Sequence, residues 1–161
     1  MSATPITPTT KYFSRGTTAI VFVESISSIS AVTRSEINDG IDLSLEVQST
    51  EGWTINATDI PTPNIGSVFT GSIPGPTSTD ECALVTYADI GGQDVRVLMP
   101  RGTNGYILMM WGGDVSGRPM DVFPVRVASI GKSASTEEDA ATARVRFSIT
   151  SEPAEDVAIP A

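Results

Sequence analysis

Apolar side chains at every second position constrain the fold of this chain more than any other feature of its sequence. In the clearest case, polar residues at positions 42, 44, 46 and 48 alternate with four apolar ones, which are Ile41, Leu43, Leu45 and Val47. Successive side chains of a β-strand point to opposite faces, so this spacing predicts a strand with one buried and one wet face. Residues 53–58 and 143–150 repeat the alternation. The sequence therefore predicts a mainly β protein.

Shorter apolar runs predict the remaining strands. These runs cover residues 18–24, 67–72, 82–88, 106–111 and 120–130. The sequence Ser-Thr-Glu-Gly at residues 49–52 suits a hairpin between its neighbouring strands, and Asn104-Gly105 predicts a tight turn before Tyr106 because both residues tolerate positive φ. About seven short strands separated by turns are typical of an antiparallel β-sandwich or barrel.

Helical signal is confined to one segment, so we expect one short helix flanking the sheet. Residues 93–99 follow two glycines and stop at Pro100, and Asp94 is suited to be the N-cap. We expect no more than a further turn within residues 136–142. Residues 59–79 contain four prolines and three glycines, which predicts a long loop around a short strand. Loops of this length are often functional.

The termini differ in composition from the rest of the chain. Residues 1–16 are rich in Thr, Ser and Pro, and residues 151–161 show no strong apolar period. Such ends are loose unless a partner holds them. We therefore divide the chain into an N-terminal arm at 1–16, a β-sandwich domain at 17–150 and a C-terminal tail at 151–161. The 161 residues suffice for one domain of ordinary size.

The composition argues against an enzyme. Histidine is absent, which removes the commonest general base and the commonest transition-metal ligand. Cys82 is the one cysteine, so the chain cannot form an internal disulfide. Without a histidine to activate it, Cys82 fits a buried strand residue better than a nucleophile. No glycine-rich phosphate loop is present. We predict no catalytic residue, no cofactor and no metal site.

The charge of the chain limits its partners. Nineteen acidic and ten basic residues give a formal net charge of −9, which disfavours nucleic acid as a bound ligand. Glu137, Glu138 and Asp139 are consecutive, which fits a solvated loop better than a cation site. The most apolar stretches, residues 19–23 and 107–111, have five residues each, whereas a membrane-spanning helix needs about 20, so we expect no membrane contact.

Two arginines on one strand face are candidates for an interface. Arg144 and Arg146 are two residues apart in a predicted strand and therefore share a side of it. They would either pair with acids on neighbouring strands or contact a second subunit. The sequence leaves both interpretations open.

Several segments, taken in order, resemble one known family. After the first predicted strand these are residues 32–37 (VTRSEI), 40–43 (GIDL), 52–53 (GW), 73–75 (IPG), 101–106 (RGTNGY) and 120–127 (MDVFPVRV). Together they are similar to the tail tube, or major tail, proteins of siphophages and actinobacterial prophages over roughly residues 17–150. One departure is Val32, at a position where that family frequently has proline.

The resemblance implies a structural subunit of a bacteriophage tail tube. Such subunits form hexameric rings that stack into a hollow tube around a tape measure protein, and the genome later passes through without specific binding. It also implies tail terminator and tail tip proteins as partners, a place in the virion tail and assembly in the host cytoplasm. We expect one wet strand face to line the channel, and its members are Asp42, Ser44, Glu46 and Gln48.

Two other functions fit the same sequence. The tube subunit of a contractile injection system, of the Hcp-like type, would share the fold and differ in its neighbouring genes. A capsid decoration or Ig-like adhesion module would bind a surface and would not polymerise alone. An enzyme is disfavoured, because no residue set for catalysis is evident.

Overall fold

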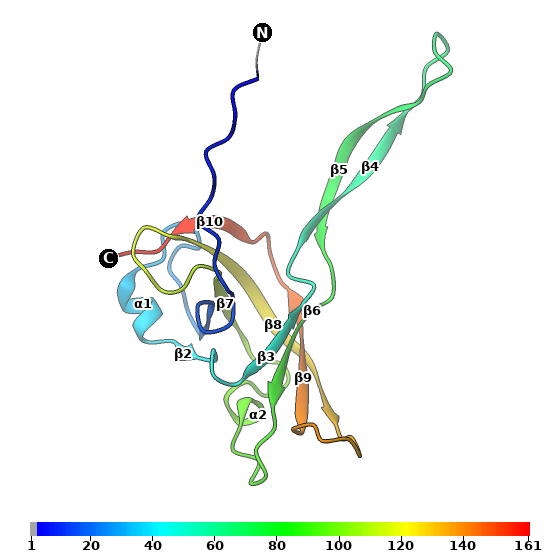
Figure 1. The fold of residues 1–161 in the computed structure, drawn as a ribbon. Coiled ribbons are helices and arrows are strands. Elements are labelled where there is room, and N and C mark those ends of the chain that lie inside the picture. Colours follow the sequence, from blue (N-terminus) through cyan, green and yellow to red (C-terminus); the bar gives the residue numbers. More distant parts are fainter. Residues whose placement is uncertain (1–2) are drawn as a thin grey trace.

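A computed structural model describes residues 3–161 (Figure 1). Its strands are β1 Ala19–Val23, β2 Ile41–Asp42, β3 Val47–Glu51, β4 Ile55–Thr62, β5 Gly71–Thr79, β6 Cys82–Tyr87, β7 Asn104–Met110, β8 Pro119–Ser133, β9 Thr142–Ile149 and β10 Ala154–Ala158. The two helices of the described chain are short, α1 Arg34–Asn38 and α2 Val95–Leu98. The prediction of a mainly β, antiparallel fold is confirmed, with more strands than the sequence indicated.

Eight of these strands form one sheet in the order β2-β1-β7-β8-β9-β6-β3, with β10 paired to β8 outside this path. The 15-residue strand β8 is long enough to take part in both halves of the sheet. Its first half pairs with β7 and β10, and its second half pairs with β9. A register shift between Val127 and Ser129 interrupts the β8–β9 ladder. Such irregularities let one strand bend between two layers, so the sheet curls around its own core.

The larger core lies between the two halves of the curled sheet. Side chains from β1, β7 and β8 meet those from β6 and β9 there, with Trp53 among them. The Trp53 ring stands edge-on to Phe123, with centroids 5.0 Å apart and planes at 75°. Its indole N–H donates to the carbonyl of Ala83 at 3.0 Å. Edge-to-face aromatic pairs with satisfied polar atoms hold a core in one arrangement.

A second core covers the opposite face of β1 and β7. Alternate residues of β1 divide between the two cores, with Phe22 in the first and Val21 in the second. Ile37 of α1 and Ile159 near the C-terminus close this second core from outside. The last segment is therefore part of the fold. The expectation of a loose C-terminal tail is wrong, because β10 pairs with β8 and Ile159 is buried.

Helix α1 was absent from the sequence-based prediction. Thr33 and Glu36 form a capping box at its start. The Glu36 carboxylate accepts backbone N–H bonds from Ser27 at 2.7 Å and from Thr33 at 2.8 Å. The Thr-x-x-Glu spacing is the sequence signature of such a start and could have predicted the helix.

The predicted strand through residues 41–47 is interrupted. Ile41 and Asp42 pair with β1, and Val47 pairs with Thr86 of β6 as the first residue of β3. Between them is a turn in which the N–H groups of Glu46 and Val47 donate to the carbonyl of Leu43. The Asp42 carboxylate accepts the backbone N–H of Ser44 at 2.9 Å, and a side chain that captures nearby backbone favours a turn over a strand. Leu45 is consequently 92% exposed, although it fits the apolar period.

Two predicted turns are also wrong. Asn104 and Gly105 lie within β7, and the turn comes earlier, where the N–H of Thr103 donates to the carbonyl of Pro100. A glycine is needed at 105 because a Cβ there would lie 2.4 Å from the Phe22 ring. No hairpin forms at residues 49–52, because β3 pairs with β6. Gly52, at φ +80°, lies between β3 of the main sheet and β4.

The predicted helix is confirmed in a shorter form. Helix α2 has Asp94 as its N-cap, and the Asp94 side chain accepts the N–H of Arg96. Residues 136–142 contain bends but no helix before β9 begins. The predicted long loop at 59–79 is mostly a two-stranded ribbon of β4 and β5, and the predicted strand at 67–72 falls largely on its tip.

Candidate assembly surfaces

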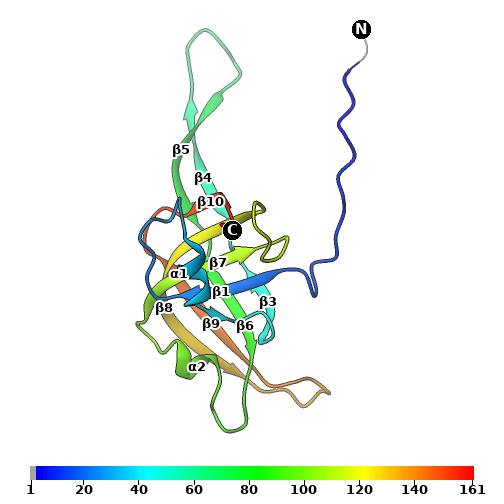
Figure 2. The same cartoon turned by 90° about the vertical axis from the view of Figure 1, so that its left-hand side faces the viewer.

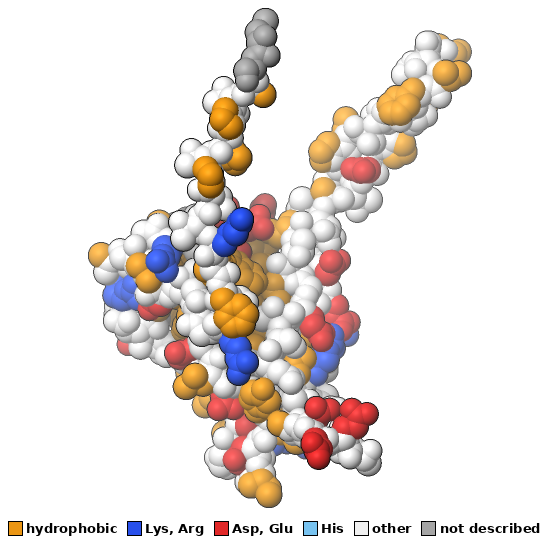
Figure 3. All heavy atoms as spheres, viewed as in Figure 1, with side chains coloured by type: hydrophobic (Ala, Val, Ile, Leu, Met, Phe, Trp, Pro, Cys, Tyr) orange, Lys and Arg blue, Asp and Glu red, His pale blue; other side chains and the backbone are white. Residues whose placement is uncertain are grey.

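The β4–β5 ribbon projects far beyond the body of the molecule (Figures 1 and 2). Asp59 is its one charged residue, whereas its exposed large apolar side chains are Ile60, Ile65, Val68, Phe69 and Ile73. Figure 3 shows apolar side chains as separate patches along the ribbon and near its tip. An isolated two-stranded ribbon has little stability of its own in water. Large apolar side chains exposed in such number are typical of a surface that contacts another protein.

Both strands of the ribbon contain proline. Pro61 lies in β4, and Pro74 and Pro76 lie in β5. Proline lacks the N–H that an added strand would need, so it protects a free edge from strand pairing. Gly75 sits where a Cβ would be 2.4 Å from the carbonyl of Thr58, next to the register shift in the ribbon.

The N-terminal arm projects on the same side as the ribbon (Figures 1 and 2). Residues 3–13 have no regular secondary structure, and Ile6, Tyr12 and Phe13 are 86%, 58% and 73% exposed. The first acidic residue of the chain is Glu24, so the arm carries only the positive charges of its two basic residues, which are Lys11 and Arg15. Residues 1 and 2 of the predicted arm lie outside the described residues. The arm is therefore a Thr- and Pro-rich segment with three exposed large apolar side chains and a net positive charge.

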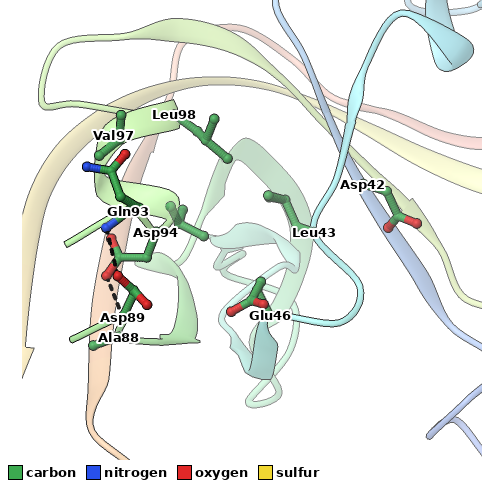
Figure 4. Close-up of a pocket in the computed structure, with 10 residues that line it drawn as sticks. Asp42, Leu43, Glu46, Ala88, Asp89, Gln93, Asp94, Val97 and Leu98 are labelled. Atoms are coloured by element: carbon green, nitrogen blue, oxygen red, sulfur yellow. Dashed lines mark hydrogen bonds between the residues drawn. The ribbon is translucent and has the colours of Figure 1, made fainter. Parts of the chain in front are cut away.

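A groove of about 390 Å³ lies at the opposite end, between α2 and the turn after β2. Figure 4 shows Leu43 and Glu46 across from Val97 and Leu98 of α2. The groove has acidic side chains at Asp42, Glu46, Asp89 and Asp94, and no basic residue lines it. It combines apolar walls with negative charge.

The four acids of the groove differ in how they are engaged. Asp94 accepts hydrogen bonds from the Arg96 side chain, which with backbone donors holds the pKa of Asp94 well below its ordinary value. Asp89 accepts the N–H groups of Gly91 and Gln93. Glu46 makes no side-chain hydrogen bond or ion pair within residues 3–161. The charge of Glu46 is the one most available to a partner.

The four predicted channel residues do not share a strand face. Asp42 ends β2, Ser44 and Glu46 lie in the turn, and Gln48 lies in β3. The Oγ of Ser44 accepts the N–H of Ile20, so Ser44 secures the turn to β1. Whether any of the four faces a channel stays a prediction, but the continuous strand on which it rested is absent.

The structure brings Arg144 and Arg146 together with acids of the same chain. Arg144 pairs with Glu51 and Glu81, each at 2.8 Å, and Arg146 pairs with Glu81 at 3.3 Å. Cross-strand pairing, one of the two interpretations, is therefore confirmed. The hydrogen bond from Arg144 is the main reason that the pKa of Glu81 is lowered. Contact of either arginine with a second subunit stays a prediction.

Cys82 is fully buried in the larger core. Burial, with a smaller effect from Asp80, raises the pKa of the thiol to about 11. A thiol that is protonated at neutral pH is a poor nucleophile. Within residues 3–161, no group of three or more potential ligands could hold a metal ion. None of the described helices has the length and hydropathy required to cross a bilayer.

Comparison with solved structures shows what the fold is similar to. A chain in the six-fold symmetrised baseplate of the anti-feeding prophage is 10% identical, covers 94% of this chain and 97% of its own, and has a TM-score of 0.59. An Hcp protein (9% identity, 88% and 99% coverage, TM-score 0.47) and the SPP1 Dit protein (14%, 83% and 49%, 0.42) are more distant. The first likeness supports the fold.

Sequence comparison places the chain in a family. No curated protein sequence matches it. A family model described as "Phage tail tube protein" matches residues 5–161, which include the ribbon, the groove and β10. This match extends over nearly the whole chain and agrees with the resemblance of the ordered motifs. The chain belongs to the phage tail tube protein family.

Proposed function

We propose that this chain forms hexameric rings that stack into the hollow tail tube of a siphophage, through which the genome passes to the host. The observation that carries the proposal is the placement of the ribbon and the arm at one end and the groove at the other (Figure 2). Two different surfaces at opposite ends make a heterologous contact, and repeated heterologous contacts build an open filament.

The free edges of the sheet support lateral closure into a ring. Strands β2 and β3 end the path of the main sheet, and β3 is exposed over most of its length. A sheet edge left open is a liability that pairing with another copy removes. The similar fold in a six-fold symmetrised baseplate supports six copies per ring.

The charge of the subunit suits a channel for DNA. At −9 per copy, a ring of six is strongly acidic. Fixed negative charge along a channel repels phosphates, which lets a nucleic acid pass without binding. In this proposal the tape measure protein fills the channel before ejection, the tail terminator and tail tip proteins cap the tube, and the protein acts without catalysis. Assembly takes place in the host cytoplasm and the product is part of the virion tail.

Electron microscopy of the purified full-length protein tests the proposal. At high concentration we expect six-fold rings or tubes with a central channel, and sedimentation that shifts with concentration. A protein that sediments as a monomer at every concentration and forms no rings would contradict the proposed function.

The tube of a contractile injection system is a second candidate. The observation that favours it is the similarity to the anti-feeding prophage baseplate chain. The neighbouring genes separate the two. A sheath gene beside this one favours the injection system, and a tape measure gene without a sheath favours the siphophage tail.

A further inference from the structure

We propose that Glu51 and Glu81 mask a phosphate-binding face formed by Arg126, Arg144 and Arg146, and that this face meets the nucleic acid in the channel. The inference rests on the proposed function for its ligand, which is the sugar-phosphate backbone of the passing genome. The two glutamates would keep the arginines from holding that backbone, so that the genome moves past them.

The three arginines lie on the side of the sheet that faces away from the larger core. Val145, between Arg144 and Arg146 in β9, belongs to that core, so the two arginines point the other way. Arg126 of β8 lies opposite Ser148, which follows Arg146 on the same side of β9. Residues opposite each other in a ladder share a face of the sheet. All three arginines therefore belong to one face.

This arginine face is open to solvent. The side chains of Arg144 and Arg146 are 41% and 44% exposed, and Arg126 is exposed as well. The outer face of the other half of the sheet is different, because Ile37 of α1 and Ile159 pack against it. An uncovered face of charged side chains suits a water-filled channel better than a contact between subunits.

The glutamates occupy the N–H groups that a phosphate would use. Nε of Arg144 donates to Glu51 at 2.9 Å, and its Nη2 donates to Glu81 at 2.8 Å. The other carboxylate oxygen of Glu81 accepts from Arg146 at 3.3 Å. Acidic and basic side chains lie next to one another beside β6 and β9 (Figures 1 and 3). A guanidinium binds phosphate through the same fork of donors, so phosphate and carboxylate compete for it.

The charge of the face complements an anionic ligand. Three arginines against two glutamates leave these five residues at +1, whereas the whole chain carries −9. The acidic remainder of a ring would repel nucleic acid at longer range, and the two glutamates would act at contact distance. Arg126 forms no ion pair within residues 3–161 and would supply one weak contact per copy.

Glutamine at both positions removes the mask and keeps the size of the side chains. Binding of a short fluorescent DNA duplex to dispersed full-length protein is followed by anisotropy. In E51Q/E81Q it should become at least about tenfold tighter, because two arginines are released. Each phosphate contact contributes about 0.9 to the slope of log affinity against log salt, so the slope should steepen by about 2. Unchanged affinity and slope would overturn the inference.

A matched control separates the mask from net charge. Glu24→Gln with Glu152→Gln makes the same charge change on exposed residues that form no ion pair within the described chain. This variant should bind DNA as the original protein does. Adding Arg144→Gln and Arg146→Gln to E51Q/E81Q should abolish its gain. If E51Q/E81Q gained self-association and no DNA binding, the arginines would bind protein and the inference would fail.

Thiol labelling of assembled tubes tests where the face lies. Ser148→Cys places a thiol beside the arginines, and the native Cys82 is buried. A small maleimide should label S148C in tubes, whereas a maleimide on a carrier too large to enter the channel should not. The control Ser35→Cys, exposed on α1, should react with both reagents. Labelling of S148C by the large reagent would show that the face does not line the channel.

The outcomes distinguish this inference from the proposed function. Tubes without any gain of DNA binding in E51Q/E81Q would refute the mask and leave the tube standing. A gain of DNA binding without rings or tubes would support the mask and refute the tube. Circular dichroism establishes that each variant is folded. Where E51Q/E81Q fails to fold, NMR of the original protein decides: DNA at low salt should shift the Nε–H signal of the unpaired Arg126 before that of Arg144, and no shift of Arg126 would refute the face.

Discussion

The guanidinium of Arg144 lies 2.8 Å from the carboxylate of Glu81, and this ion pair joins β9 to the residue that precedes β6. Arg144 also bonds Glu51 of β3, so one side chain links three neighbouring segments of the sheet. Both members of the pair are about half exposed, with side-chain exposures of 41% and 52%. Exposed ion pairs add little to the free energy of unfolding. The clearest measurable effect of this pair is therefore on the pKa of Glu81.

Replacing Arg144 with glutamine should raise the pKa of Glu81 towards the ordinary value of 4.5. The folded-state pKa is lowered by the pair, so its stabilising effect is present above the ordinary pKa and is lost as pH falls through the lowered one. Carboxylate titration by NMR measures the change. Arg118→Gln, on a different part of the surface, should leave the pKa of Glu81 unchanged. An unchanged pKa in R144Q would show that the pair does not form in solution.

The capping box of α1 should make stability depend on pH. Hydrogen bonds from the backbone N–H groups of Thr33 and Ser27 lower the pKa of Glu36 to about 2. Their contribution is complete above the ordinary pKa of 4.5 and disappears as pH falls towards 2. The melting temperature of Glu36→Gln should therefore fall less steeply than that of the original protein over this range. Parallel curves for the two proteins would contradict the prediction.

Thr33→Ala tests the same helix start without changing charge. It removes the side-chain acceptor of the Glu36 N–H, which typically costs about 1 kcal/mol at an N-cap. For a domain of this size the melting temperature should fall by about 2–4 °C. Thr33→Ser keeps the acceptor and should behave like the original protein.

Gly105→Ala should destabilise the body of the protein, because its methyl group would overlap the Phe22 ring and the carbonyl of Val23. Overpacking of this kind costs about 1–3 kcal/mol in unfolding free energy. Gly66→Ala is the matched control at the ribbon tip, where the nearest atom would be 3.6 Å from the new Cβ. Urea unfolding of both variants gives the difference. Equal midpoints would show that β7 does not approach Phe22 as described.

Cys82 should resist alkylation in the native protein. Its thiol is buried and has a pKa of about 11, so little thiolate exists at pH 8. Labelling by iodoacetamide should follow global unfolding and rise sharply in denaturant. Mass spectrometry measures the labelled fraction with time. Rapid labelling without denaturant would mean that β6 opens locally.

The ribbon tip should be needed for polymerisation and not for folding. Ile65→Ser with Phe69→Ser removes two large apolar side chains that are 110% and 77% exposed in the single chain. We expect unchanged melting and loss of tubes in electron micrographs. Ser72→Ala, on the stem of the ribbon, should polymerise normally. Tubes formed by the double serine variant would exclude the tip as an assembly surface.

Sequence analysis predicted one hydrogen bond between residues that are close together in the chain. Asp94 was identified as an N-cap, and its side chain does accept the N–H two residues later. The pairing of Arg144 with acids was one of two open interpretations, and the sequence did not identify its partners Glu51 and Glu81, which are 93 and 63 residues away. The capping box of Thr33 and Glu36 was equally local and was overlooked. The groove could not be predicted, because it joins the turn after β2 to α2, about fifty residues further along the chain.

The sequence by itself determined the β character, the family and the lack of histidine, because period, motif order and composition are properties of the linear chain. Only the tertiary structure decided which strands pair. The apolar period at residues 41–47 predicted a continuous strand. In the structure the Asp42 carboxylate accepts the backbone N–H of Ser44, a turn forms and Leu45 is exposed. Gly105 was needed for its contact with Phe22, more than eighty residues away. A local pattern specifies which faces are apolar, whereas strand partners depend on contacts that form only when distant segments meet.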